Sequence, residues 1–177
     1  MGSQERTRIV VTDAGVLINL AHVDRLSLLG SLPAYEFVVP PEVVAEVLVP
    51  EQAEALARAL DAGHVAEISF TTTAELDAYV HLVQVLGKGE ASCLAIAEVQ
   101  GWCVACDERR KFLKLARERL GPDRVLNTAG IYVLALRAGL VSIDEADADK
   151  HALEKHRFKM KFASFRDVLG STEAEKK

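Results

Sequence analysis

The sequence predicts an α/β protein, a three-layer α/β/α sandwich in which a central parallel sheet lies between two layers of helices. Short β-branched and apolar runs alternate along the chain with helical segments of roughly ten to fifteen residues. The strand candidates are mainly apolar, as strands buried on both faces are. No internal repeat or low-complexity linker divides the 177 residues. One layered domain is therefore predicted.

Five short apolar runs are expected to form the strands of this sheet. The first, residues 8–13, ends on Asp13, and the fourth, residues 102–106, runs directly into Asp107. The other three are residues 37–39, 65–69 and 125–127. Because helical segments separate them, the strands are expected to run parallel.

Helices are predicted where apolar residues recur at helical spacing and where stop residues follow. Gly30 and Pro33 are expected to end the first helix, and Pro41 to open the second at the position where proline is favoured. The expected segments are residues 16–29, 41–49, 51–62, 73–86, 90–100, 108–120 and 129–138, with two further helices after Asp144.

We expect residues 8–170 to form the single domain, with residues 1–7 as a disordered N-terminus or cloning remnant and residues 171–177 as a polar tail. A chain of this length buries about 70% of its unfolded surface, enough for a core without staples. No apolar stretch approaches the ~18 residues of a transmembrane helix, and residues 1–6 lack the apolar core of a secretory signal.

Three cysteines are an odd and sparse count, which favours a reducing cytoplasm over a disulfide scaffold. Cys103 and Cys106 have the spacing of a redox or metal pair. They lie on a predicted strand without a second pair, however, so buried thiols are the expected outcome.

The net charge of −5 at first argues against a nucleic-acid partner, because nonspecific phosphate binding normally needs a basic surface. The charge is unevenly distributed. Residues 1–87 hold four Lys and Arg against 12 Asp and Glu, whereas residues 88–177 hold 17 against 14. This asymmetry predicts an acidic site that faces a basic surface.

Two of the predicted strands end on an aspartate, Asp13 and Asp107. Ligands of open parallel sheets bind beyond the carboxyl ends of the strands. Each aspartate alone is better explained as a helix cap or turn residue, since both precede predicted helices. Their matching positions strengthen the functional interpretation of the pair.

Two glutamates are candidates to join these aspartates. Glu46 is predicted to lie mid-helix after the second strand, with Glu42 one turn earlier, so either side chain is equally consistent with a solvated position. Glu90 opens the helix after Gly87-Lys88-Gly89, where the helix dipole favours a glutamate even without a function.

Four phrases of the chain, in this order and spacing, resemble those of the PIN-domain ribonucleases and lie closest to the VapC-like toxin branch of that family. They are DAGVLINL from Asp13, PPEVVAEV from Pro40, GKGEA from Gly87 and DERR from Asp107. The resemblance extends from about Arg8 to Leu169. It implies a metal-dependent endoribonuclease that leaves a 5′-phosphate and a 3′-hydroxyl.

The resemblance assigns catalysis and the binding of Mg²⁺ or Mn²⁺ to four carboxylates: Asp13, Glu46, Glu90 and Asp107. Oxygen ligands of this kind suit these hard cations, whereas zinc prefers Cys and His. Two-metal phosphodiesterases hold their ions roughly 3.5–4 Å apart. One or two ions are consistent with the residues.

Two positions depart from the family pattern, and two more are implied as supports for the carboxylates. Glu90 stands where many members have Asp, and Gly15 where many have Ser or Thr. Asn19 and Thr128 are the implied supports, although a helix N-cap is an equal alternative for Thr128.

Basic residues of the second half are the candidate RNA contacts: Lys88, Arg109, Arg110, Lys114 and Arg117. For the helix that follows Asp107, a solvated charged face is an equal alternative. Residues 150–161 carry five Lys and Arg against one Glu, which fits a solvated surface, an RNA rim or a dock for an acidic partner.

The resemblance implies two further partners, an antitoxin protein that covers the site and a second copy of the chain. The apolar segment Ile131–Leu136 suits a homodimer interface or the core equally. Two other functions stay open: a non-catalytic module that binds RNA or protein, and a small-molecule hydrolase on an α/β scaffold.

Overall fold

The computed structural model describes residues 7–107 and 111–174 and contains a five-stranded parallel sheet. The strand order is β3–β2–β1–β4–β5, and Val10 of the central strand lies opposite Phe37 on one side and Cys103 on the other. The strands are β1 (Arg8–Thr12), β2 (Tyr35–Val39), β3 (Ala66–Glu67), β4 (Cys103–Ala105) and β5 (Val125–Leu126). The five predicted strands are confirmed, although β3 and β5 are shorter than expected.

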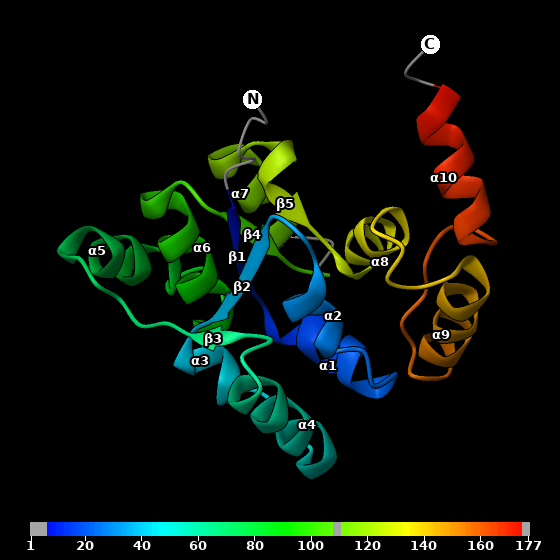
Figure 1. Ribbon diagram of the computed structural model, residues 1–177. Helices are drawn as coiled ribbons and strands as arrows, with labels where there is room; N and C mark the ends of the chain where they lie inside the picture. The colour runs from blue at the N-terminus through cyan, green and yellow to red at the C-terminus, as the bar shows by residue number, and fades with distance from the viewer. Residues whose placement is uncertain (1–6, 108–110, 175–177) are drawn as a thin grey trace, which may run out of the picture.

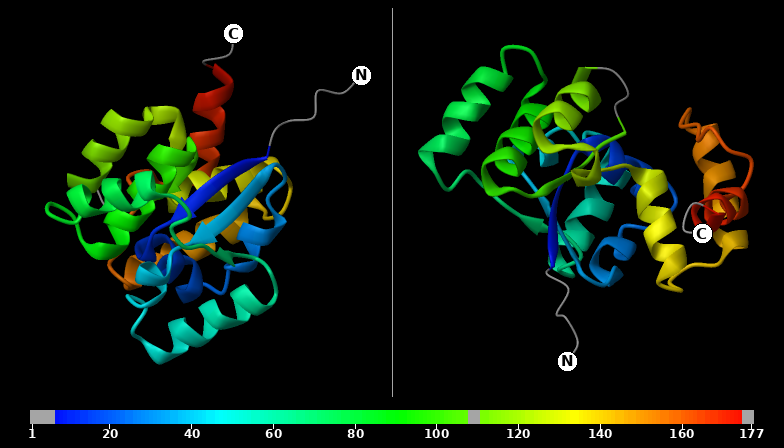
Figure 2. Two further views of the ribbon diagram at one scale, coloured as in Figure 1. Left: turned by 90° about the vertical axis from the view of Figure 1, so that its left-hand side faces the viewer. Right: turned by 90° about the horizontal axis from the view of Figure 1, so that it is seen from above.

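Helices cover both faces of this sheet (Figures 1 and 2). One face carries α1 (Ala14–His22), α2 (Ser27–Ser31), α4 (Pro50–Asp61) and α8 (Thr128–Arg137). The other carries α5 (Thr73–Leu82), α6 (Lys88–Gln100) and α7 (Lys111–Leu120). The short α3 (Pro41–Val44) packs against α6, while α9 (Ile143–Lys155) and α10 (Phe165–Ala174) pack outside α8. The predicted three-layer α/β/α fold is confirmed.

The core lies on both sides of the central strands β1 and β4. Val10, Val11 and Val104 are fully buried, as expected for strands covered on two faces. Helix α6 is buried along Ala91–Ala97 because it lies between the sheet and α5. Burying each large apolar side chain stabilises the folded state by about 1.5–3 kcal/mol, and this packing holds the strands and their ends in place.

The predicted helix over residues 16–29 is wrong in one respect, because the chain turns between α1 and α2. Asp24 adopts a left-handed conformation with φ of 54°, and the Arg25 amide donates to the Leu20 carbonyl at 2.8 Å, which ends α1. Gly30 lies inside α2 rather than ending the helix. A Cβ there would approach His64 Nδ1 to 2.4 Å, so close packing explains this glycine.

The predicted helix over residues 41–49 is also too long, since α3 ends at Val44 and Glu46 lies in the turn that follows. Pro50 begins α4 and holds Val49 in an extended conformation, with φ of −75° and ψ of 123°. Two other limits shift: α5 ends at Leu82 and α6 begins at Lys88.

Several further expectations concern features of the whole chain. Cys93, Cys103 and Cys106 are buried thiols that form no disulfide with one another, as expected for Cys103 and Cys106. In the described ranges, no helix is both long enough and apolar enough to cross a membrane.

Helix α10 continues to Ala174, so the expected domain limit at residue 170 falls within it.

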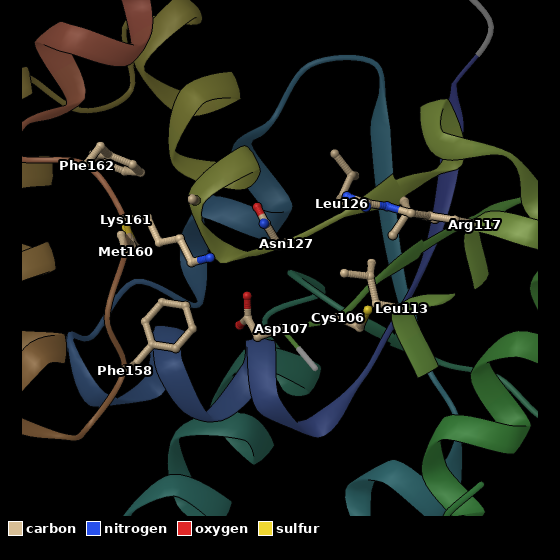
Figure 3. A pocket seen from close by; sticks show the side chains of 12 residues that line it. Cys106, Asp107, Leu113, Arg117, Leu126, Asn127, Phe158, Met160, Lys161 and Phe162 are labelled. Carbon is tan, nitrogen blue, oxygen red and sulfur yellow. The ribbon is translucent and has the colours of Figure 1, made fainter. Parts of the chain in front are cut away.

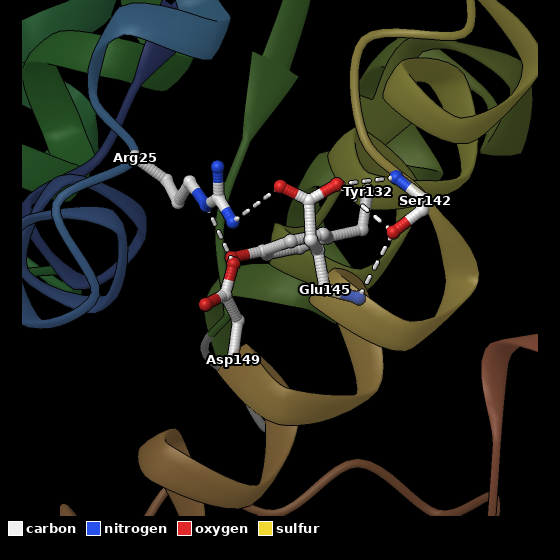
Figure 4. A network of polar contacts seen from close by, with 5 residues as sticks. All are labelled: Arg25, Tyr132, Ser142, Glu145 and Asp149. Carbon is white, nitrogen blue, oxygen red and sulfur yellow. Dashed lines mark hydrogen bonds and ion pairs between the residues drawn. The ribbon is translucent and has the colours of Figure 1, made fainter.

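Helix α9 is attached to the domain by a partly buried polar network (Figure 4). Arg25 donates to Asp149 at 2.7 Å, and the same carboxylate accepts from the Tyr132 hydroxyl at 2.9 Å. Arg25 also pairs with Glu145 at 3.6 Å, where Glu145 caps its own helix through Ser142. Burial raises the pKa of Tyr132, so this hydroxyl remains a donor. The network connects the turn after α1 to α8 and α9.

Replacing Asp149 with alanine is expected to destabilise the protein by about 2 kcal/mol, because Arg25 and the buried Tyr132 hydroxyl lose their shared acceptor. Urea unfolding followed by circular dichroism measures this change. Glu118→Ala is the control, since it breaks only the exposed 3.9 Å pair with Lys114 and should cost less than about 0.5 kcal/mol. Equal effects of both variants would contradict the prediction.

Candidate functional site

The carboxyl ends of the parallel strands meet at one edge of the sheet and place the candidate residues there. Asp13 follows β1, and Asp107 lies two residues beyond β4, the neighbouring strand. The chain leaves β1 and β4 toward opposite sides of the sheet, since β2 lies on one side of the pair and β5 on the other. Such a change of direction opens a crevice in which α/β proteins bind ligands.

Asp13 is both a helix cap and a nearly buried acid, so the two interpretations of this residue are compatible. Its side chain accepts from the Gly15 amide at 3.4 Å at the start of α1, and its residue exposure is only 8%. Burial raises the pKa of Asp13 to about 6, and the nearby Glu90 and Glu46 carboxylates add to the rise. Hydrogen bonds from the Ala14 and Gly15 amides oppose it. A nearby cation would stabilise the charged form of this acid.

The Asp107 carboxylate is fixed by the two residues expected to support it. One oxygen accepts from the Thr128 amide at 2.9 Å, and the other accepts from the Thr128 hydroxyl at 2.5 Å and from Asn19 Nδ2 at 2.9 Å. Asn127, not Thr128, is the N-cap of α8, through its side-chain oxygen on the Gly130 amide at 2.8 Å. The alternative of Thr128 as an N-cap is therefore wrong, and its hydroxyl is directed to Asp107.

The two glutamates approach Asp13 from the turn after α3 and from α6, and each is held by a backbone amide. Glu46 accepts from the Gly89 amide at 2.9 Å, and Glu90 accepts from the Gly87 amide at 3.1 Å. Glu46 is exposed in the turn after α3 rather than mid-helix, and Glu90 lies in the first turn of α6. The position of Glu90 beside Gly87 agrees with its capping interpretation, without excluding a role at the site.

Asp107, Glu46 and Glu90 all lie near Asp13, but the four carboxylates are not clustered around a single point. A Cβ placed on Gly15 would lie 3.6 Å from Asp13 Oδ2 and 4.0 Å from Asp107 Cβ, so Gly15 lies beside both aspartates. Ordinary contact distances there leave room for a serine. Within residues 7–107 and 111–174, no three His, Cys, Asp or Glu side chains converge as a metal-holding group. Each carboxylate is instead turned toward its own hydrogen-bond donors.

Gly89 is required for the position of Glu46. A Cβ on Gly89 would come within 2.8 Å of both Glu46 carboxylate oxygens. Gly89→Ala is therefore expected to displace the Glu46 carboxylate while changing the melting temperature by less than about 3 °C, because an exposed side chain moves aside at little cost. We expect several-fold weaker Mn²⁺ binding by calorimetry, similar to that of Glu46→Gln. Unchanged binding in Gly89→Ala together with weakened binding in Glu46→Gln would contradict this account of Gly89.

The candidate RNA contacts separate into three groups. Lys88 is exposed and lies with Glu42 and Glu46 around a shallow hollow. Lys114 points to solvent and pairs with Glu118 at 3.9 Å, as a solvated helix face does. Arg117 instead lines a cavity beside Asp107. Arg109 and Arg110 lie outside the described residues.

The basic segment over residues 150–161 has more than one role. Lys150 is nearly buried and pairs with Glu154 at 2.9 Å, so it serves the fold. Lys161, at the other end, lines the same cavity as Arg117. The apolar segment Ile131–Leu136 contributes Ile131, Tyr132 and Ala135 to the buried core.

Sequence reasoning missed the wall of this cavity, which is formed by the connection between α9 and α10 (Figure 3). Phe158, Met160 and Phe162 line it, more than 50 positions along the chain from Asp107. The alternation of basic and apolar residues from Arg157 to Phe162 is the pattern that indicates such an extended, one-sided segment.

The comparisons with known proteins agree with this geometry. A search of curated proteins gave no significant match. A family model described as a PIN domain matches residues 9–173, from the first strand to the last helix. The chain therefore belongs to the PIN-domain family.

Proposed function

We propose that this protein is a divalent-metal-dependent endoribonuclease that hydrolyses RNA phosphodiester bonds. The observation that carries the proposal is the placement of Asp13 and Asp107 at the ends of adjacent strands, with Glu46 and Glu90 close to Asp13. PIN domains are generally nucleases that use divalent metals, and this supports the same conclusion.

The residues present fit a hard divalent cation. The donors at the site are carboxylate oxygens, which Mg²⁺ and Mn²⁺ prefer, and Asp13 is a buried acid without a salt bridge to any described residue. Asp13, Asp107, Glu46 and Glu90 would hold the cation, the two glutamates after rotation of their side chains. A cation held there would neutralise the carboxylates, polarise the phosphate and activate water.

The surrounding residues of the chain position the carboxylates and the RNA. Asn19 and Thr128 orient the Asp107 carboxylate through three hydrogen bonds. The Gly89 amide does the same for Glu46. Lys88, at the exposed edge beside Glu46, is placed to contact a phosphate of the substrate.

The wider biological role that we propose is that of the toxin in a toxin–antitoxin pair, of the VapC-like branch. An antitoxin would then cover the acidic site, and two copies of the chain would associate as a homodimer. The three buried thiols, none of them in a disulfide with another, fit a reducing cytoplasm. A short neighbouring reading frame for a DNA-binding protein, and the solution mass by light scattering, would test these partners.

The assay is cleavage of single-stranded RNA by purified protein with Mn²⁺ or Mg²⁺, compared with a chelator. Wild type should cleave with metal, and Asp13→Asn should not. Equal cleavage by the variant would point to a contaminating nuclease and overturn the proposal.

A PIN-like module that only binds RNA or protein is the alternative outcome. In that case calorimetry would find no Mn²⁺ binding near millimolar metal, and RNA would bind without being cut. Turnover of small phosphate esters without RNA cleavage would instead indicate a small-molecule hydrolase.

A further inference from the structure

A cavity of about 430 Å³ opens beside Asp107, within the size range of small-ligand pockets. One side is formed by Leu113 and Arg117 of α7 together with β5. The other side is formed by the connection between α9 and α10 (Figure 3). Asp107 therefore borders this cavity, whereas Asp13, Glu46 and Glu90 are not among its lining residues.

The α9–α10 connection has an apolar side and a basic side. Phe158, Met160 and Phe162 line the cavity and are buried or half-buried. Arg157, Lys159 and Lys161 alternate with them and are exposed. An extended segment with this alternation presents ring faces inward and positive charge at the rim.

Two basic residues line the cavity together with Asp107. Figure 3 shows the Lys161 side chain extended toward Asn127 and Asp107, with the Phe158 ring on the same side of Asp107. Arg117 lies on the opposite wall, across from Lys161. Neither Arg117 nor Lys161 forms an ion pair with another residue of the part of the chain that the structure describes. Two cations with no partner there border an apolar space next to an acidic site.

Contacts behind the cavity hold this wall in place. The Phe162 ring packs edge-on against Phe165 at 4.9 Å between centroids, and Lys150 Nζ lies 5.9 Å from the Phe162 centroid. Asp147 accepts from Ser164 and from the Phe165 amide, at 2.6 and 2.8 Å. The wall is therefore formed before any ligand arrives, which reduces the entropy lost on binding.

We propose that this cavity binds one nucleobase of single-stranded RNA, adjacent to the phosphate that is cleaved. The inference rests on the proposed nuclease function. The Phe158 ring provides a stacking face, and Lys161 and Arg117 contact the flanking phosphates. A base paired within a duplex remains stacked and does not enter, so the substrate is single-stranded at this position.

A protein partner with an apolar side chain is the competing occupant. The lining of the cavity favours RNA, because two cations and Asp107 are among its residues. An apolar side chain gains nothing from those charges, whereas a nucleotide combines an aromatic base with a phosphate.

The first experiment removes the base and the ring separately. In an oligoribonucleotide with one cleavage site, an abasic residue at one position beside that site should lower kcat/KM by about tenfold to a hundredfold. Phe158→Leu keeps the apolar volume but loses the ring face, and it should lower kcat/KM on the intact RNA by the same factor. Phe158→Tyr, which keeps the ring face, should lose activity on the abasic RNA as wild type does. The abasic substitution should add little further loss in Phe158→Leu.

A matched control separates stacking from folding. Phe70 is another half-buried phenylalanine, packed on Tyr79 near the opposite edge of the sheet, and Phe70→Leu should leave the response to the abasic residue unchanged. Melting temperatures are measured for each variant. Equal loss by Phe158→Leu on intact and abasic RNA would indicate a structural role or a protein-binding role, and would overturn the inference.

The second experiment does not require cleavage. Oligouridylate containing 5-iodouridine is irradiated with the protein in a chelator, and the crosslinked peptide is identified by mass spectrometry. We expect the crosslink within residues 158–162, and its loss in Phe158→Leu. A crosslink there without any metal-dependent cleavage would overturn the nuclease proposal but support the base pocket. Cleavage without that crosslink, and without an abasic effect, would overturn the pocket alone.

Discussion

Asp107→Asn is expected to lower kcat/KM for metal-dependent RNA cleavage at least about a hundredfold while leaving the fold intact. Even residues that only orient metal ligands typically change metal affinity or activity by about tenfold to a hundredfold, so loss of a ligand should cost no less. The amide retains an oxygen for the Thr128 amide, and the Thr128 hydroxyl and the Asn19 side chain can reorient to meet its NH₂ group. The lost charge therefore accounts for the effect.

The measurement is cleavage of a fluorescent single-stranded RNA over a range of Mn²⁺ concentrations, with thermal melting as a check on folding. Asp77→Asn is the matched control, because it makes the same change on the exposed surface of α5. Full activity in Asp107→Asn at saturating Mn²⁺ would show that Asp107 is not needed for metal binding or catalysis.

Asp13→Asn is expected to abolish cleavage and, in the absence of metal, to stabilise the protein by about 3 kcal/mol at pH 7.5. Burial raises the pKa of Asp13 from an ordinary value of 3.8 to about 6, so charging this buried acid opposes folding at neutral pH. Asparagine caps helices as well as aspartate does, so the start of α1 is retained. For a chain of this size the melting temperature should rise by roughly 6–12 °C.

The raised pKa of Asp13 also determines how the difference in unfolding free energy between Asp13→Asn and wild type depends on pH. Between about pH 4 and pH 6 the folded wild type binds more protons at Asp13 than the unfolded chain, so its stability falls as the pH rises. The difference should be small near pH 4, grow up to about pH 6 and stay constant above it. Melting curves recorded in a chelator measure this dependence. A variant that melts lower than wild type at pH 7.5 would contradict the burial argument.

Addition of Mn²⁺ should reverse the order of stability, because a bound cation stabilises only the protein that retains its carboxylate. This opposition between stability without metal and activity with metal is typical of sites that are arranged for function rather than for folding.

Much of the site could be predicted from the sequence because its residues follow strand ends. The apolar run before Asp13 and the one before Asp107 are short and uninterrupted, which is typical of buried parallel strands, and strands of this kind end at one edge of the sheet. The supporting roles of Asn19 and Thr128 came from the family resemblance. The bond from Asn19 to Asp107 joins residues 88 positions apart, which no local pattern predicts.

Two errors in the first predicted helix have one physical cause, namely contacts between residues that are far apart in the chain. The turn after α1 places Arg25 against Asp149, a partner 124 positions away. Gly30 is small because His64 approaches it, not because a helix ends there. The helix predicted to reach Val49 is a different case. A residue before proline disfavours the helical conformation, and this local rule at Pro50 argues against a helix up to Val49, although the apolar spacing favoured one.

The sequence by itself determined the α/β/α layering and the acidic residues at the strand ends, because both follow from short-range patterns of burial and turning. It also showed that the net charge of −5 was distributed as an acidic half and a basic half. Only the tertiary structure decided which basic residues lie near the acidic site and which stabilise the fold. Arg117 and Lys161 line the cavity beside Asp107, whereas Lys150 pairs with Glu154. That choice depends on how α9 and α10 pack against α8, an arrangement made by contacts between distant segments rather than by neighbours in the chain.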